Sequence, residues 1–402
     1  MAKATVQFWY SLQMKPQMLE PDSRQLRGKA AIVGVGTYGL GEAPGESAVE
    51  LIAKAAHIAL ADAGLTIRDV DGLFCNSVFS THPSLTVAEY LGLNVRFSES
   101  SPLGGAAFVN YAVTAAAALE AGLCKIALIC YGSNQRTAFG RLHARSQATD
   151  YESPYKPRHP MTSYALAAAR HMHEYGTTRE QMAAVAVAAR KWAALNPEAF
   201  MRDPLSIDAV LSSRMLNDPL TVRDCCLVTD GAGAVVMVRK DRARDMPNKS
   251  AYVLGGGIAH WHMQIDQMPD LTVTAATQSG AIAFKMSGLS PADVDMAQIY
   301  DAFTINTILA MEDLGFCKKG EGGAFVASGA IEPGGSLPVN TNGGGLSCCH
   351  PGMYGIFTLI EATRQLRGTA GDRQVSDVEI VLCHGNGGRL ASQTTTILAA
   401  QP

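Results

Sequence analysis

The chain has 402 residues, of which 47% are hydrophobic and 17% charged, and its formal net charge is −3. This is an ordinary globular composition with ample material for a core. No notable run of lysine or arginine occurs and no apolar segment reaches the length of a bilayer span, so nothing indicates a nucleic-acid partner or a membrane. Nine cysteines without CxxC spacing, in a chain without an export signal, indicate free thiols in a reducing compartment. We therefore expect a cytoplasmic protein without a metal site.

The N-terminal part combines an extension with a glycine-rich strand. Residues 1–27 lack a signal-peptide pattern and are expected to form an N-terminal extension. An apolar strand is predicted from residue 29 to 35, and residues 34–39 match the GxGxxG dinucleotide pattern. The following strand, however, ends at residues 75–77 without the acidic residue that the ribose requires, which excludes a nicotinamide site. We interpret the glycines as a strand-to-helix turn, with Ser47 as a helix cap.

One helix–turn–strand unit occurs twice. A predicted helix over residues 47–63 is followed by Gly-Leu-x-x-x-Asp-Val-Asp at 64–71 and then by a strand. The same string recurs at residues 288–295, again between a helix and a strand. The two copies are separated by a little more than half of the chain length, which indicates two duplicated halves. The alternation of helices and strands indicates α/β layering.

The middle of the chain contains an apparent insertion. A helix is predicted within residues 98–122 and a buried strand at 125–131, after which residues 134–215 interrupt the alternation. Two helices, at 161–175 and 178–194, are predicted inside this segment. His171 and His173 lie two residues apart on the first of them, so they cannot share a metal face and are expected to be surface or packing residues.

The most informative stretch runs from residue 340 to 355 and contains three consecutive glycines followed by His350-Pro351. Proline suits the first turn of a helix, and a helix is predicted over residues 355–366 with Gly368 as its stop. A histidine at a helix N-terminus is favoured in its neutral form, which can donate one hydrogen bond to an oxyanion.

Together these motifs resemble the thiolase superfamily. Asn340-x-Asn342-Gly343-Gly344 followed by His350-Pro351 is similar to the family's Asn-x-x-Gly-Gly…Gly-His-Pro loop, with a cysteine at 349 in place of a glycine. Residues 230–234 resemble its Asp-Gly-Ala-x-Ala strand, and residues 383–387 its Cys-x-Gly-x-Gly loop. The branch most similar to this chain contains the sterol-carrier-type thiolases and the steroid side-chain aldolases.

The resemblance implies a duplicated five-layered α/β fold made of two βαβαβαββ halves related by a pseudo-twofold axis. The halves would occupy residues 28–250 and 251–402, with a loop domain inserted at about 134–215. It also implies coenzyme A as part of the substrate thioester, a homodimer, and a small partner with a zinc ribbon and an oligonucleotide-fold domain that completes a heterotetramer. This chain itself has no zinc-ligand spacing.

A residue that thiolases require is missing. The thiolases that this chain resembles carry a nucleophilic cysteine at the start of the helix predicted within 98–122. Here that place is taken by Gly105 in an ungapped alignment, or by Pro102 with a gap, and neither can be acylated. No cysteine occurs between Cys75 and Cys124.

The resemblance implies the remaining site residues. Tyr300 stands where the family has an asparagine or histidine that binds the thioester oxygen or a water. The candidate catalytic residues are Tyr300, His350, Tyr354, Cys383 and His384. The candidate residues around the coenzyme A thioester are Asn340, Gly343, Gly344, Gly385 and Gly387.

These residues and the resemblance leave three hypotheses for the function. The first is retro-aldol cleavage of a 3-hydroxyacyl-CoA with a steroid-type, branched or aromatic side chain, which needs no acyl-enzyme. In this hypothesis Tyr354 is the favoured base, and Tyr300 and His350 face the enolate. The second is a thiolase or acyltransferase whose nucleophile has moved to Cys75, Cys348, Cys349 or Cys383. The third is a non-catalytic subunit that binds acyl-CoA or lipid.

Overall fold

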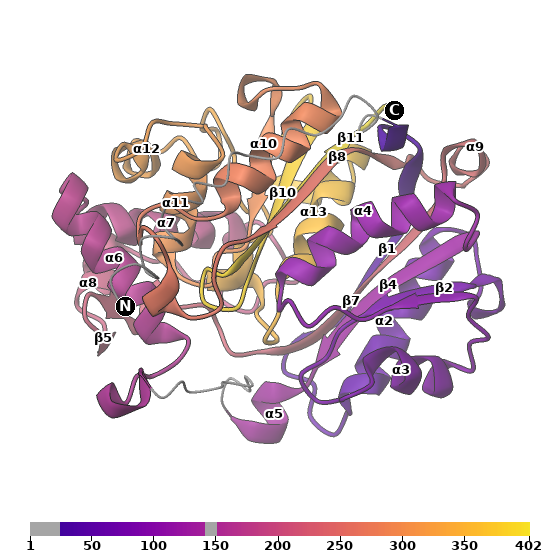
Figure 1. Ribbon diagram of the computed structural model, residues 1–402, viewed down its shortest axis with the longest axis horizontal. Helices are drawn as coiled ribbons and strands as arrows, with labels where there is room; N and C mark the ends of the chain where they lie inside the picture. Colours follow the sequence, from indigo (N-terminus) through magenta and orange to yellow (C-terminus); the bar gives the residue numbers. More distant parts are fainter. Residues whose placement is uncertain (1–24, 141–150) are drawn as a thin grey trace, which may run out of the picture.

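The computed structural model describes residues 25–140 and 151–402, whose strands form a nine-stranded mixed sheet and a small two-stranded one (Figure 1). The large sheet has the order β3-β2-β4-β7-β1-β8-β11-β10-β9. In that order the bounds are Phe97–Glu99, Gly72–Cys75, Ile126–Ser133, Asp230–Arg239, Ala30–Gly41, Ala251–His260, Ser392–Ala399, Ile380–Gly387 and Met296–Ile299.

The two parts of this sheet have equivalent topologies. In the first, β2 is parallel to β4, β4 is antiparallel to β7, and β7 is antiparallel to β1. In the second, β9 is parallel to β10, β10 is antiparallel to β11, and β11 is antiparallel to β8. The parts join where Ala31 of β1 pairs with Tyr252 of β8. The strand connections thus repeat in the way that the duplicated sequence unit predicts.

Four long helices arrange these strands into layers. Helix α2 (Ala48–Asp62) packs on β1, β4 and β7 of the first part, and α10 (Ala276–Ser287) packs on β8 and β11 of the second. Helices α4 (Ala106–Glu120) and α13 (Gly355–Arg367) contact each other and strands of both parts, so they form the central layer. The layers are thus α2, the first part of the sheet, the pair α4 and α13, the second part of the sheet, and α10. This is the expected five-layered α/β architecture.

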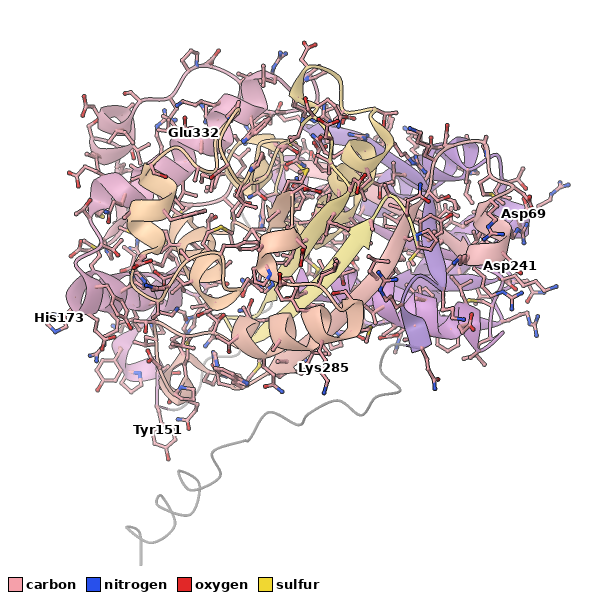
Figure 2. The ribbon with its side chains drawn as sticks, turned by 90° about the horizontal axis from the view of Figure 1, so that it is seen from above. Asp69, Tyr151, His173, Asp241, Lys285 and Glu332 are labelled. Carbon is pink, nitrogen blue, oxygen red and sulfur yellow. The ribbon has the colours of Figure 1, made fainter. Side chains whose placement is uncertain are left out.

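Helices of the segment between β4 and β7 pack against the second part of the molecule, whereas α5 (Gln135–Phe139) contacts β7 of the first part (Figure 1). Helix α6 (Met161–Tyr175) contacts α11 (Thr304–Asp313). Helix α7 (Arg179–Ala194) contacts α11 and α12 (Gly322–Ala327). On α6, His173 is exposed and points outwards (Figure 2), whereas His171 is buried and bonded to Glu312 at 3.0 Å. The elements of this segment are α5 (Gln135–Phe139), α6 (Met161–Tyr175), α7 (Arg179–Ala194), α8 (Ile207–Leu211), β5 (Met215–Asn217) and β6 (Leu220–Thr221). The remaining helices are α3 (Pro83–Leu91), α9 (Lys240–Ala243), α11 (Thr304–Asp313) and α12 (Gly322–Ala327), with a π-helical turn at Gly344–Cys348.

The expected turn at the GxGxxG pattern is wrong, because these glycines lie inside β1. A Cβ atom at Gly34 would stand 2.1 Å from the carbonyl oxygen of Ala59, and one at Gly36 would stand 2.6 Å from that of Ala55. The glycines therefore let the backbone of α2 approach the strand closely. Ser47 does cap α2, in a capping box with Glu50.

Candidate active site

A cavity of about 470 Å³ opens where the two parts of the molecule and the inserted segment meet. Its walls come from the start of α4, from α6, from the segment after β9, from the loop before α13 and from the end of β10. The residues that line the cavity include Gly104, Gly105, Tyr164, Cys226, Tyr300, Phe303, His350, Asn386, Gly387 and Gly388. This volume lies within the range of small-molecule and cofactor sites.

Gly105 marks the place expected for the missing nucleophile. It is the N-cap residue of α4 and lines the cavity. A Cβ atom at this position would lie only 1.8 Å from Cε1 of the Tyr300 ring. Carbon atoms in contact are about 3.5–4.0 Å apart, so no side chain fits here while Tyr300 keeps its position. The phenol ring thus occupies the space that a side chain on this helix terminus would need.

Tyr300 and His350 form a hydrogen-bonded pair at the cavity wall, with 2.7 Å between Oη and Nε2. The backbone N–H of Tyr300 donates to the carbonyl oxygen of His384 at 3.0 Å, which fixes the tyrosine beside β10. His350 is held through its backbone, where its N–H donates to Thr229 Oγ1 at 3.0 Å and its carbonyl accepts from Gln135 Nε2 at 2.9 Å.

Burial keeps both members of this pair neutral. It lowers the pKa of His350 to about 4, with hydrogen bonding to backbone groups opposing the shift. It also raises the pKa of Tyr300 well above its ordinary value, assisted by the neighbouring Cys226, Tyr164 and Tyr131. A neutral phenol next to a neutral imidazole can pass a proton along the hydrogen bond in either direction.

Tyr354, the favoured base, does not lie at this cavity wall. Its side chain is fully buried, and its phenol donates to Asn342 Oδ1 at 2.7 Å. Its ring centroid is 5.8 Å from that of Tyr300, on the side of the π-helical turn. Direct proton transfer from this phenol to a ligand in the cavity therefore has no geometric support.

Cys383 and His384 are also held away from the cavity. They are neighbours on β10 and so point to opposite faces of a sheet that helices cover on both sides. The Cys383 thiol donates to the carbonyl oxygen of Thr358 at 3.5 Å, and burial raises its pKa strongly. His384 bonds Gln393 Oε1 at 2.9 Å and Thr395 Oγ1 at 3.1 Å, and burial lowers its pKa to about 4.

Most of the glycine loop expected around coenzyme A packs against protein instead. Asn340 accepts the backbone N–H of Ile299 at 2.7 Å through Oδ1, and a Cβ at Gly343 would touch Ala193 at 2.7 Å. A Cβ at Gly344 would stand 2.1 Å from the Asp301 carboxylate.

The second expected glycine loop, at the end of β10, divides between the core and the cavity. Gly385 packs against Val109 and Ala106 of α4, where a Cβ would come within about 3 Å of both. Gly387 does line the cavity. Of the five residues expected around the thioester, it is the one that the structure brings there.

The Asp301 side chain holds the glycine loop that precedes His350. Its carboxylate accepts the backbone N–H of Gly345 at 2.6 Å, and a further one from Leu346 at 3.4 Å. Burial raises its pKa to about 7, while these bonds oppose the shift. Since Asp301 follows Tyr300 directly, this contact ties the tyrosine to the loop that carries His350.

Among the cavity residues that the sequence did not predict are Tyr164, Asn386 and Cys226. Tyr164 lies on α6, which was predicted as a helix, and Asn386 lies within the Cys-x-Gly-x-Gly loop. Cys226 is the one cysteine of the described chain at the cavity wall, and burial raises its pKa well above the ordinary value. A thiol held protonated in this way is a poor nucleophile.

The relocated nucleophiles predicted from the sequence are Cys75, Cys348, Cys349 and Cys383, and all four are buried outside the cavity. Within residues 25–140 and 151–402 no group of three histidine, cysteine or acidic side chains is arranged to hold a metal ion. No helix in these ranges is long and apolar enough to cross a membrane.

Known proteins share this architecture. Residues 257–400 match the family model described as thiolase C-terminal domain-like. A 17-hydroxy-3-oxo-4-pregnene-20-carboxyl-CoA lyase of Mycobacterium tuberculosis is 36% identical over 379 residues, which cover 89% of this chain and 96% of that protein. An acetyl-CoA acetyltransferase of Methanothermobacter thermautotrophicus is 34% identical over 374 residues, with coverages of 89% and 96%. The solved structure described as an Ltp2-ChsH2(DUF35) aldolase superposes with a TM-score of 0.85 at 34% identity, covering 93% of this chain and 98% of that one.

Proposed function

This chain belongs to the thiolase superfamily, and on that premise we propose that it cleaves the Cα–Cβ bond of a 3-hydroxyacyl-CoA by a retro-aldol reaction. The products are a shorter acyl-CoA and a ketone or aldehyde. The observation that carries this proposal is the Tyr300 ring in the space next to Gly105. A thiol nucleophile has no room there, whereas the phenol that replaces it is hydrogen-bonded to an imidazole.

The reaction needs a base for the 3-hydroxyl proton and later a proton donor for Cα. We assign both steps to Tyr300 and His350. The phenol oxygen accepts the hydroxyl proton of the substrate while its own proton moves to Nε2 of His350, so no free phenolate forms. The Cβ–O bond becomes a carbonyl, and the electrons of the Cα–Cβ bond move into the thioester enolate. The proton then returns through Tyr300 to Cα, which balances the reaction.

The enolate makes this relay possible. Because burial lowers the pKa of His350 to about 4, an imidazolium is unfavourable in the free protein near pH 7. The negative enolate forms as the proton reaches His350, and its charge stabilises the imidazolium. Gly105, the N-cap residue of α4, lines the cavity, and the positive end of the helix dipole favours the enolate.

We propose a steroid-type, branched or aromatic acyl group as the substrate class. The Mycobacterium tuberculosis lyase is named for a 17-hydroxy steroid that carries a carboxyl-CoA group. We also propose a homodimer that binds a small zinc-ribbon and oligonucleotide-fold subunit. The similar solved structure, described as an Ltp2-ChsH2(DUF35) aldolase, supports a second component. The two halves at residues 28–250 and 251–402, with the loop domain at about 134–215, are part of the same proposal.

The second candidate function is a thiolase or acyltransferase reaction on a 3-oxoacyl-CoA. The identity to an acetyl-CoA acetyltransferase favours it, and Cys226 is the cavity cysteine that would have to serve. The raised pKa of its thiol argues against it. A non-catalytic acyl-CoA-binding subunit is the third candidate, and turnover by the wild-type chain would exclude it.

One assay separates these functions. The full-length protein, alone and with a DUF35-type partner, is incubated with a 3-hydroxyacyl-CoA and no free coenzyme A. We expect a shorter acyl-CoA and a carbonyl product in equal amounts, and a loss of about 10²–10⁴-fold in Tyr300→Phe. Cleavage of only a 3-oxoacyl-CoA, dependent on free coenzyme A and with an acyl group on a cysteine in the mass spectrum, would overturn the proposal.

A further inference from the structure

Tyr164 is a second cavity-lining tyrosine whose role the relay above does not use. It lies on α6 of the inserted segment, and 2% of its surface is exposed. Its ring stacks on Phe303, with 4.2 Å between centroids and 26° between planes. Since Phe303 follows Tyr300 by three residues, this contact fixes Tyr164 relative to the reacting pair.

A chain of side-chain amides leads to the Tyr164 phenol. Nε2 of Gln393 donates to Oδ1 of Asn386 at 2.9 Å and to the carbonyl oxygen of Leu390 at 3.1 Å. Two acceptors at this nitrogen fix the orientation of the Gln393 amide. Its Oε1 then faces Nε2 of His384 at 2.9 Å, so that His384 nitrogen carries a proton and donates.

The direction of this chain determines what Tyr164 does. Because Oδ1 of Asn386 accepts from Gln393, the Nδ2 group of Asn386 faces Tyr164 and donates to its oxygen at 2.7 Å. The phenol is therefore the acceptor in that bond, and its own proton must go elsewhere. Within the described residues, that proton is directed to the carbonyl oxygen of Gly388 at 3.3 Å. This is longer than the 2.5–3.0 Å of a normal O–H···O bond.

A phenol that accepts a strong hydrogen bond and donates only a weak one is a polarised donor. Exchange of the weak Gly388 bond for a negatively charged ligand oxygen gains a charge-assisted bond. In the retro-aldol reaction such an oxygen arises when the thioester carbonyl becomes an enolate, and the Tyr300–His350 pair is occupied with the hydroxyl proton at that moment.

We propose that Tyr164 is a further catalytic residue, whose phenol donates a hydrogen bond to the thioester oxygen as the enolate forms, and that Asn386 positions it. This inference rests on the proposed retro-aldol function. No proton is transferred at Tyr164: the electrons of the Cα–Cβ bond end on the thioester oxygen and are stabilised there. Burial raises the pKa of Tyr164 to about 12, which keeps the donor protonated at every working pH.

The test uses Tyr164→Phe, which keeps the stacking on Phe303 and removes only the hydroxyl group. Tyr175→Phe is the matched control, because Tyr175 lies at the end of the same helix and outside the cavity wall. Loss of one oxyanion donor lowers kcat about 10²–10³-fold, so we expect this fall in Tyr164→Phe with KM within threefold. Tyr175→Phe should match the wild type.

A second readout is independent of bond cleavage. In D2O, the enzyme should exchange the Cα hydrogens of a short acyl-CoA product through the same enolate, and Tyr164→Phe should lose this exchange to the same degree. Asn386→Ala should lower kcat and the exchange rate about tenfold, again with little change in KM. If circular dichroism shows that Tyr164→Phe does not fold, the Asn386→Ala variant still tests the role of Tyr164.

Each outcome has a distinct meaning. A folded Tyr164→Phe that keeps more than one fifth of the wild-type kcat and exchange rate overturns the role of Tyr164. The same holds if only KM changes, or if Asn386→Ala retains wild-type kcat and exchange. If the wild type cleaves no 3-hydroxyacyl-CoA with or without a partner, the retro-aldol function fails, and the exchange assay still decides whether Tyr164 stabilises an enolate.

Discussion

Gly105→Ala tests whether the Tyr300 ring has replaced a side chain at the start of α4. The backbone of Gly105 has φ −67° and ψ −21°, which any residue adopts in a helix. In an open helical site alanine would therefore stabilise the protein, by up to about 1 kcal/mol. Here its Cβ would lie 1.8 Å from the Tyr300 ring, roughly half of a normal contact distance.

The expected result is a loss of both stability and activity. Overpacking of this kind costs about 1–3 kcal/mol in the free energy of unfolding. The ring must also move by more than 1 Å, which breaks the 2.7 Å bond to His350, and a displacement of that size costs about 100-fold in rate. Urea unfolding measures the first effect, and the rate of 3-hydroxyacyl-CoA cleavage measures the second.

A double-mutant cycle supplies the control. In a Tyr300→Asn background the ring is absent, so Gly105→Ala should cost less there than in the wild type, with a coupling energy of about 0.5–3 kcal/mol. Gly105→Cys should show no acylated cysteine, because the thiol would meet the same ring. An unchanged stability of Gly105→Ala, or an equal cost in both backgrounds, would refute the reasoning.

Three further predictions concern the same site. Tyr300→Phe leaves the Nε2 atom of buried His350 without its hydrogen-bond partner. It should therefore lower the free energy of unfolding, measured by urea titration, by about 1–3 kcal/mol. Unchanged stability would contradict the hydrogen bond. Tyr354→Phe should keep cleavage within about threefold of the wild type, because its phenol bonds Asn342 and does not reach the cavity; a loss as large as in Tyr300→Phe would restore Tyr354 as the base. Both His350 and His384 have a folded-state pKa of about 4, below the unfolded value of about 6.5. Between these two pH values the unfolded chain therefore binds more protons than the folded one. The free energy of unfolding should fall as pH drops from 6.5 to 4, by about 3 kcal/mol for each histidine. His350→Gln should reduce the slope of this pH profile of unfolding, and an identical slope would refute the assignment.

The sequence predicted most elements because their signals are local. Helix α2 begins at the capping box of Ser47 and Glu50, and α13 ends at Gly368, close to the expected positions. The GxGxxG glycines misled because their role depends on the backbone of α2, about twenty residues away along the chain. No local pattern reports such a close approach.

The sequence predicted the site residues that stand in local motifs and missed those placed by contacts distant in the sequence. Tyr300 and His350 stood in motifs, and the structure brings them together at the cavity wall. Tyr354 follows His350 by only four residues, but the orientation of α13 directs it to Asn342. Tyr164 could not be assigned, because its place at the cavity depends on how α6 packs against Phe303.

The inserted segment also determines how activity depends on the integrity of the chain. Helices α6 and α7 follow β4 in sequence, yet they pack on α11 and α12 of the other part. The cavity wall therefore combines Gly105 before α4 and Tyr164 of the inserted segment with Tyr300 and His350 of the second part. Any event that shifts these parts relative to one another, such as mild heating or a cut between them, would move the cavity residues out of register and inactivate the protein. Activity therefore reports on how the parts of the chain are assembled.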